Sequence, residues 1–133
     1  MILVDSSVWI DWLNAEDTAQ TDALARLLDE PESPVICDRV LQEVLQGIRD
    51  DRHADNIERT LTALTCLDTG GVKLALASAA LYRGLRKQGI TIRAGNDIVI
   101  AALCMQYKLQ LLHCDRDFDA IAKVTRLDVW TGK

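Results

Sequence analysis

The chain has 133 residues, of which 49% are hydrophobic and 26% charged, a composition typical of a folded globular domain. Its net charge of −5 argues, taken alone, against a nucleic-acid partner. No apolar run reaches the roughly 18 residues that span a bilayer, and Asp5 and Asp11 interrupt the apolar start too early for a secretory signal. We therefore expect one cytoplasmic domain over residues 1–133, without a membrane segment.

Short apolar runs alternate with amphipathic stretches in the first half of the chain, which predicts short buried strands separated by helices. Polar residues that commonly cap helices precede several of these stretches. The expected elements are a strand at 1–4, a short helix to Leu13 capped by Asp5 or Ser6, a helix at 18–28, a loop at 31–34, a strand at 35–37, a helix at 38–48 capped by Asp38, a helix at 51–64 and an edge strand from Leu67.

The second half begins after the break at Gly70 and Gly71. The expected elements are a helix at 72–87 ended by Gly89 in a left-handed conformation, a short extended piece at 91–92, a turn at 94–96, a helix at 97–107, a strand at 109–113, a helical turn at 115–122 and a strand at 127–130. The helix that follows Asp97 is apolar on every side, which predicts that it is buried.

This order of short buried strands and helices favours an α/β fold. We expect a parallel sheet with helices on both faces, a three-layer α/β/α arrangement. Ligands of such a sheet bind outside the carboxyl ends of its strands, so residues that directly follow the strands are the first candidates for a functional site.

Four acidic residues fall at or near that edge. Asp5 follows the first strand, Asp115 follows the strand at 109–113, Asp97 opens the buried helix, and Glu43 lies in the helix after the second strand. Each alone fits an ordinary role, a helix cap for the aspartates and a solvated helix position for Glu43. Together their like charges require a cation, and carboxylate oxygens suit Mg²⁺ or Mn²⁺.

Such a site fits hydrolysis of a phosphodiester by a metal-activated water. The sequence has no evident Ser-His-Asp arrangement and no glycine-rich phosphate loop. His113 terminates an apolar run, so it either ends a strand or touches a phosphate.

The four cysteines, at positions 37, 66, 104 and 114, form no CxxC pair, which argues against zinc. Apolar residues flank each one, so all four are expected to be buried, reduced thiols. Trp9 and Trp12 fit core packing and a protein interface equally well.

The negative charge is concentrated at the start, because residues 1–33 hold eight acids and one base whereas residues 34–133 hold twelve acids and fourteen bases. Several later bases cluster, which indicates either a rim for a phosphate backbone or an ordinary solvated helix face. They are Arg83, Arg86, Lys87 and Arg93.

Four segments in this order resemble the motifs of the PIN-domain family, and within it the VapC toxins of bacterial toxin–antitoxin pairs. The segments are Ile2 to Asp11, Leu41 to Gly47, Asn96 to Ala102 and Leu111 to Phe118. The resemblance covers nearly the whole chain. It implies that Asp5, Glu43, Asp97 and Asp115 hold the metal, that Ser7 supports Asp5, and that Asp117 assists. Many relatives have Thr at the position of His113, which leaves the choice between Asp115 and Asp117 open.

The resemblance implies an endoribonuclease toxin that uses Mg²⁺ or Mn²⁺, forms a homodimer and is inhibited by an antitoxin covering the acidic site. Arg86, Arg93 and Arg116 are weaker candidates for phosphate contacts. Two alternatives stay open: a structure-specific DNA nuclease with the same metal site, and a non-enzymatic phosphoacceptor like receiver domains. Against the latter, no suitable lysine follows the last strands.

Overall fold

The computed structural model describes residues 1–31 and 34–132, so the loop expected at 31–34 lies partly outside the described residues. Within them, five parallel strands form one sheet in the order β3-β2-β1-β4-β5. The strands are β1 (Ile2–Val4), β2 (Val35–Cys37), β3 (Thr65–Leu67), β4 (Gln110–Leu112) and β5 (Asp128–Val129). A strand was predicted near each of these five places. β3 lies at one edge of the sheet as expected, but it ends at Leu67, where it was expected to begin.

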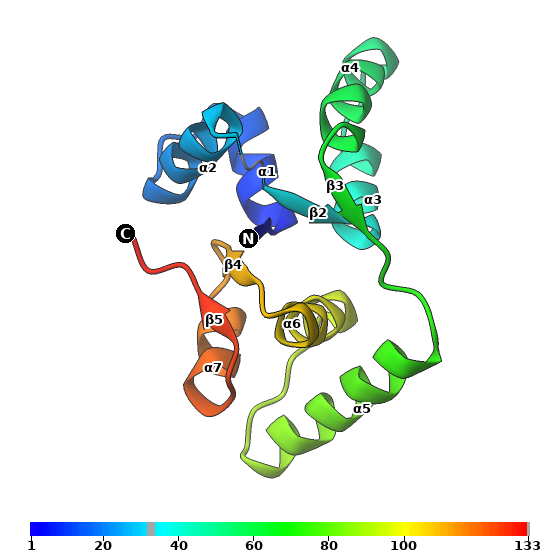
Figure 1. Ribbon diagram of the computed structural model, residues 1–133, viewed down its shortest axis with the longest axis vertical. Coiled ribbons are helices and arrows are strands. Elements are labelled where there is room, and N and C mark those ends of the chain that lie inside the picture. Colours follow the sequence, from blue (N-terminus) through cyan, green and yellow to red (C-terminus); the bar gives the residue numbers. More distant parts are fainter. Residues whose placement is uncertain (32–33, 133) are drawn as a thin grey trace.

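In the described part of the chain, seven helices cover the sheet. They are α1 (Ser6–Leu13), α2 (Ala19–Asp29), α3 (Asp38–Gln46), α4 (Asp51–Thr62), α5 (Val72–Lys87), α6 (Gly95–Tyr107) and α7 (Arg116–Val124). Helices α1 to α4 pack on one another, whereas α6 packs on α5 and α7 (Figure 1). After β3 the chain returns past β1 and forms β4 on its other side. Because the crossovers are right-handed, this reversal of direction places α1 to α4 on one face of the sheet and α5 to α7 on the other. The expected three-layer α/β/α fold is confirmed.

The sheet centre positions the site. Strands β1 and β4 pair over three residues, with Val4 opposite Leu112 at their carboxyl ends. The Asp5 N–H continues this ladder with a 2.9 Å bond to the Leu112 carbonyl. Side chains above and below these strands are fully buried, among them Trp9 and Phe118. Asp5 and the segment that follows β4 therefore lie side by side where both emerge from the buried core.

The cap expected at Asp38 is wrong. Cys37 occupies the N-cap of α3, and Asp38 is the first helical residue. The Asp38 carboxylate accepts bonds from its neighbour's N–H and from the N–H and hydroxyl of Thr69. This aspartate therefore ties the start of α3 to the loop after β3, a long-range contact that competes with a local cap.

One expectation before α6 is also wrong. The turn expected at 94–96 is largely the start of the helix, because α6 begins at Gly95. Residues 91–92, expected as a short extended piece, belong to no strand of the sheet. The first N–H groups of a helix have no intrahelical partner, so Gly95 and Asn96 cost less there than in a helix interior. Asp97 is thus the third residue of α6. The burial of α6 is confirmed.

The cysteine prediction holds for two of four thiols. Cys37 and Cys104 are buried, and burial raises their pKa values to about 11 and about 12. Cys66 and Cys114 are exposed, because one lies on the edge strand and the other in the loop after β4. All four are free thiols.

Trp9 belongs to the core. Its side chain is fully buried, and its ring meets that of half-buried Trp12 edge-to-face at 5.7 Å. Within residues 1–31 and 34–132, no helix is both long and apolar enough to cross a membrane.

Candidate active site

Asp5 is the most buried acid of the site, at 4% exposure. As the N-cap of α1, its Oδ2 accepts bonds from the Ser7 N–H at 3.1 Å and the Ser7 hydroxyl at 2.6 Å. The Ser7 hydroxyl in turn accepts the Cys114 N–H at 3.1 Å. Burial raises the pKa of Asp5 against these hydrogen bonds, and the nearby Glu43 adds to the rise. Ser7 thus holds Asp5 toward the loop after β4.

Glu43 reaches the site from α3, and both of its carboxylate oxygens are held. Oε2 accepts the Ser6 hydroxyl at 2.9 Å, and Oε1 accepts the Asn96 side-chain amide at 2.9 Å. The Asn96 carbonyl oxygen accepts a 2.6 Å bond from Arg39. This bond fixes which end of the amide faces Glu43.

Asp97, Asp115 and Asp117 offer carboxylate oxygens that all lie within 4.8 Å of one another. Partial burial, followed by the charges of Asp5, Asp115, Glu43 and Asp117 in that order, raises the pKa of Asp97 to about 7. The charges of the other four acids therefore all act on Asp97. The structure also brings Asp115 and Asp117 together at the cluster.

The cap geometry of α7 explains why both aspartates reach the cluster. Asp115 is the N-cap, and its Oδ1 accepts the Asp117 N–H at 2.9 Å. The hydrogen bond between the Asp115 side chain and the Asp117 backbone therefore holds these two residues in a fixed arrangement.

His113 is buried and supports this cap. Its Nδ1 accepts the Asp115 N–H at 3.0 Å, while its Nε2 lies 3.3 Å from an Asp119 oxygen. Because Nδ1 accepts a hydrogen bond, Nε2 carries the proton. The ring also packs on Phe118, with centroids 5.1 Å apart. His113 therefore directly follows β4, and its ring supports the N-cap residue Asp115.

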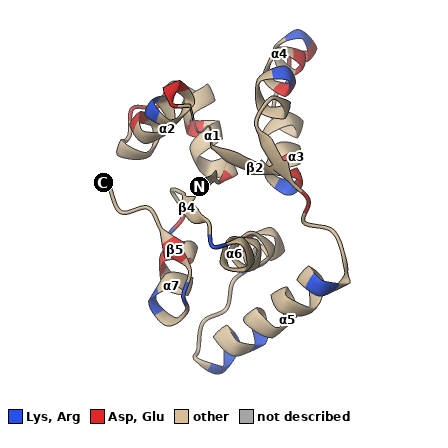
Figure 2. Ribbon diagram, viewed as in Figure 1, with Lys and Arg blue, Asp and Glu red and all other residues tan. Residues whose placement is uncertain are grey.

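The three arginines proposed from the sequence as phosphate contacts lie on different parts of the molecule. Figure 2 shows Lys and Arg, without Asp or Glu, along α5. Arg86 there lies 5.7 Å from the Tyr82 ring centroid. Arg93 is exposed, and Arg116 is exposed beside a hollow that also contains His113 and Cys114. None of these three makes a recorded bond to the acids within the described part of the chain.

Three residues that hold the acids were missed by sequence reasoning: Ser6, Arg39 and Asn96. Ser6 adjoins a predicted ligand, and Asn96 precedes another, so adjacency alone was an available signal. Arg39 was one of many charged helix residues, and only tertiary structure brings it to Asn96.

Two of the acids, Glu43 and Asp97, line a hollow of about 550 Å³ together with Arg39 and Asn96, among others. Its donor atoms are carboxylate oxygens, which fit a hard divalent cation. A proton on Asp97 at neutral pH is the alternative way to relieve the repulsion. The geometry therefore fits a metal centre that a polyanion can approach.

The chain is similar to known proteins over nearly its whole length. Residues 2–124 match the family described as the PIN domain. The chain is 34% identical to ribonuclease VapC11 of Mycobacterium tuberculosis over 128 residues, which are 96% of each protein.

Two solved structures show the same fold. A chain of VapBC2 from Rickettsia felis, solved bound to a DNA fragment from its promoter, superposes with a TM-score of 0.76 at 19% identity, over 98% of both chains. A chain of a toxin–antitoxin complex from Klebsiella pneumoniae gives 0.72 at 20% identity, covering 100% of this chain and 98% of that one.

Proposed function

The chain belongs to the PIN-domain family and is a ribonuclease toxin of the VapC type, and from that premise we propose how it cuts RNA. A divalent cation, Mg²⁺ or Mn²⁺, binds at the acidic cluster. Its ligands are Asp5, Glu43, Asp97 and Asp115, with Asp117 assisting. One observation supports this most: burial and, after it, the charges of four other carboxylates raise the pKa of Asp97 to about 7, and a bound cation would offset the part due to these charges.

A cation held by these residues would offset their charge and would make a water molecule a better nucleophile toward phosphorus at neutral pH. The protein's own groups keep the ligands in place. Ser7 orients Asp5 from one side, while Ser6 and Asn96 fix both oxygens of Glu43. Because Asp97 lies near its pKa at neutral pH, cation binding is expected to release its proton.

We further propose that a cognate antitoxin binds the chain and covers the acidic site. The toxin–antitoxin complex from Klebsiella pneumoniae supports a partner of this kind. The charge of the cluster favours a basic segment of that antitoxin as the part that enters it.

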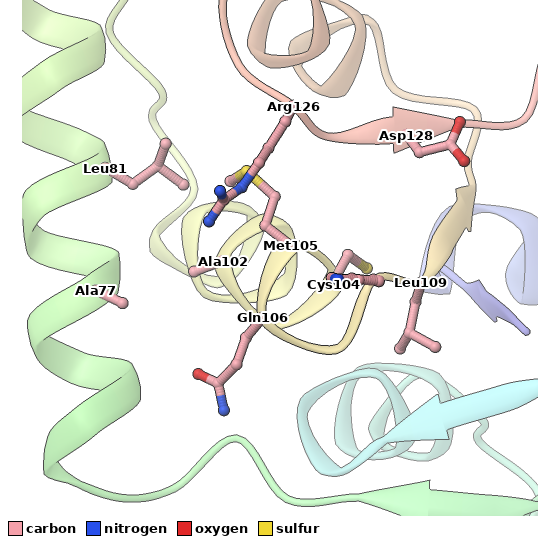
Figure 3. A pocket seen from close by; sticks show the side chains of 10 residues that line it. Ala77, Leu81, Ala102, Cys104, Met105, Gln106, Leu109, Arg126 and Asp128 are labelled. Atoms are coloured by element: carbon pink, nitrogen blue, oxygen red, sulfur yellow. The ribbon is translucent and has the colours of Figure 1, made fainter.

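A homodimer is also proposed. On α5, Val72 and Leu76 are 76% and 67% exposed, which is costly for large apolar side chains unless another surface covers them. A neighbouring hollow of about 620 Å³ is lined by Ala77 and Leu81 of α5, by residues of α6, and by Arg126. Figure 3 shows these side chains around it. This side lies away from the acidic cluster and leaves it open to RNA.

The test is cleavage of single-stranded RNA by purified, antitoxin-free protein. We expect cleavage with Mg²⁺ or Mn²⁺, none with a chelator, and none with Asp97→Asn. Asp55→Asn is the matched control, because it makes the same change at an exposed position of α4. Cleavage that survives both the chelator and Asp97→Asn would overturn the metal-site proposal.

A parallel single-stranded and duplex DNA assay addresses the DNA-nuclease alternative. Cleavage of DNA at a rate comparable with RNA would favour it. A receiver-like phosphoacceptor does not fit a PIN-domain chain.

A further inference from the structure

We propose that Arg39 binds a backbone phosphate of the substrate beside the acidic cluster. This inference rests on the proposed function, because it names the residue that holds the RNA at the same site. Arg39 lies in the first turn of α3 and lines the hollow that contains Glu43 and Asp97.

The Arg39 guanidinium is held in place by two neutral partners. Its Nε donates to the Thr69 hydroxyl at 3.1 Å, and its Nη1 donates to the Asn96 side-chain oxygen at 2.6 Å. These partners come from the loop after β3 and from the first turn of α6. An arginine fixed on separate elements has already lost much of the rotamer freedom that phosphate binding would otherwise cost.

The guanidinium keeps binding capacity after these contacts. Two of its five N–H groups are used, and within residues 1–31 and 34–132 the other three have no recorded protein partner. It forms no salt bridge there either. Its charge acts on Asp38, where burial opposes ionisation but Thr69, a backbone N–H and Arg39 together hold the pKa below its ordinary value. A fixed fork with free donors matches the geometry of a phosphate.

Electrostatics explain the need for such a residue. Five carboxylates repel an approaching RNA backbone, and one divalent cation offsets only part of that charge. Arg86 and Arg116, which the sequence suggested as phosphate contacts, are less suited to this role than Arg39. Arg86 lies against Tyr82, and Arg116 lines a different hollow. Arg39 shares its hollow with two of the proposed metal ligands.

Arg39 has a second effect that an experiment must separate, because its bond to Asn96 also helps to orient Glu43. The two roles predict opposite changes in metal binding. Removing a positive charge near the acids favours cation binding, so a pure phosphate-binding role predicts equal or tighter Mn²⁺ binding in Arg39→Gln. A pure orienting role predicts weaker Mn²⁺ binding, because Glu43 would lose its support.

The experiment measures binding of a short fluorescent single-stranded RNA of mixed sequence as a function of salt, in the full chain carrying Asp97→Asn to prevent cleavage. We expect Arg39→Gln to weaken binding roughly tenfold and to reduce the slope of log affinity against log salt by about 0.7, the value for one phosphate on a single strand. Arg39→Lys should retain the slope. Arg52→Gln, an exposed change on α4, is the matched control and should alter neither quantity.

A second measurement uses RNAs in which one phosphate at a time is a neutral methylphosphonate. The parent protein should lose affinity at one position, and Arg39→Gln should be insensitive there. Two results would overturn the role of Arg39 even if the wild type cleaves RNA. One is an unchanged RNA affinity and salt slope in Arg39→Gln. The other is an equal loss of RNA affinity in Arg39→Gln and Arg39→Lys, together with weaker Mn²⁺ binding. If the wild-type chain neither binds nor cleaves RNA, the proposed function fails as well.

Discussion

The hydroxyl of Ser6 donates a 2.9 Å hydrogen bond to Oε2 of Glu43, which joins the first residue of α1 to the second turn of α3. Asn96 binds the other oxygen of the same carboxylate from α6. A glutamate has several rotatable bonds, so two donors from different elements are an efficient way to fix it. The geometry of the acidic cluster therefore depends on residues that are not themselves proposed ligands.

We predict that Ser6→Ala weakens Mn²⁺ binding about tenfold, the usual cost of losing a residue that supports a metal ligand. Isothermal titration calorimetry gives the affinity. Ser78→Ala is the matched control, because the Ser78 hydroxyl bonds only to the Leu74 carbonyl within α5. An Mn²⁺ affinity of Ser6→Ala equal to that of the control would show that Glu43 needs no support from Ser6.

Asp97→Asn should make the metal-free protein more stable at pH 8. The pKa of Asp97 is raised from 3.8 to about 7, so between these values the folded state binds a proton that the unfolded chain has released. Stability from this group therefore falls as the pH rises through that window. After a discount for solvent screening, the expected gain from Asn is about 1–2 kcal/mol at pH 8 and vanishes below pH 4.

Urea denaturation with a chelator, at several pH values, measures this effect. Asp55→Asn should change the free energy of unfolding by less than about 0.5 kcal/mol at every pH. Saturating Mn²⁺ should reverse the order, because it stabilises the wild type more than Asp97→Asn. A metal-free Asp97→Asn protein less stable than the wild type at pH 8 would contradict the repulsion argument.

Asp117→Asn is expected to weaken Mn²⁺ binding by at least about tenfold, as Asp115→Asn should. Both carboxylates lie with that of Asp97 in one cluster, although sequence reasoning treated them as alternatives. Asp119→Asn serves as the control on the same helix, since that side chain is 58% exposed and lies against His113 instead. Calorimetry showing normal affinity for Asp117→Asn would leave Asp115 as the ligand of the pair.

The sequence predicted β1, β2 and β4 well because each contains a short, largely buried apolar run, and the burial of such runs depends little on residues far away in the chain. It failed where a long-range contact outweighs local preference. Asp38 has the chemistry of a cap, yet its carboxylate binds Thr69, 31 residues away. Gly95 and Asn96 have the chemistry of a turn, yet they begin α6.

The same distinction applies to the site. Asp5 and Asp115 follow strands and Asp97 lies in the first turn of a helix, so topology alone brings these three toward one edge, whereas Glu43 reaches it from the second turn of α3. The residues that hold Glu43 contact it across 37 and 53 positions of the chain. No local pattern encodes such separations, and Arg39 lies farther still from Asn96, 57 positions.

Leu76→Glu should convert the proposed homodimer into a monomer. A carboxylate in the centre of an apolar interface is desolvated without a partner, which costs more than such an interface usually gains per residue. Sedimentation velocity would measure the mass, with Val124→Glu on α7 as a control at a less exposed apolar position. A wild-type monomer, or a Leu76→Glu dimer, would exclude α5 as the contact surface.

His113 provides the last prediction, because its Nδ1 accepts the N–H of Asp115 and so helps to set the cap from which two carboxylates extend. His113→Ala removes the acceptor and should lower both Mn²⁺ affinity and RNA cleavage about tenfold. In His113→Asn the amide oxygen takes the position of Nδ1 and can accept the same N–H. That variant should stay within about threefold of the wild type, the loss expected if the main acceptor bond is retained.

Three comparisons make the result specific to this bond. Asp119→Asn perturbs only the contact at Nε2, and His53→Ala removes an exposed histidine of α4, so neither should match the loss in His113→Ala. Circular dichroism identifies a general loss of folding, since the His113 ring also packs on Phe118. If His113→Asn is as impaired as His113→Ala while both remain folded, His113 acts through its ring contacts and not through the N–H of Asp115.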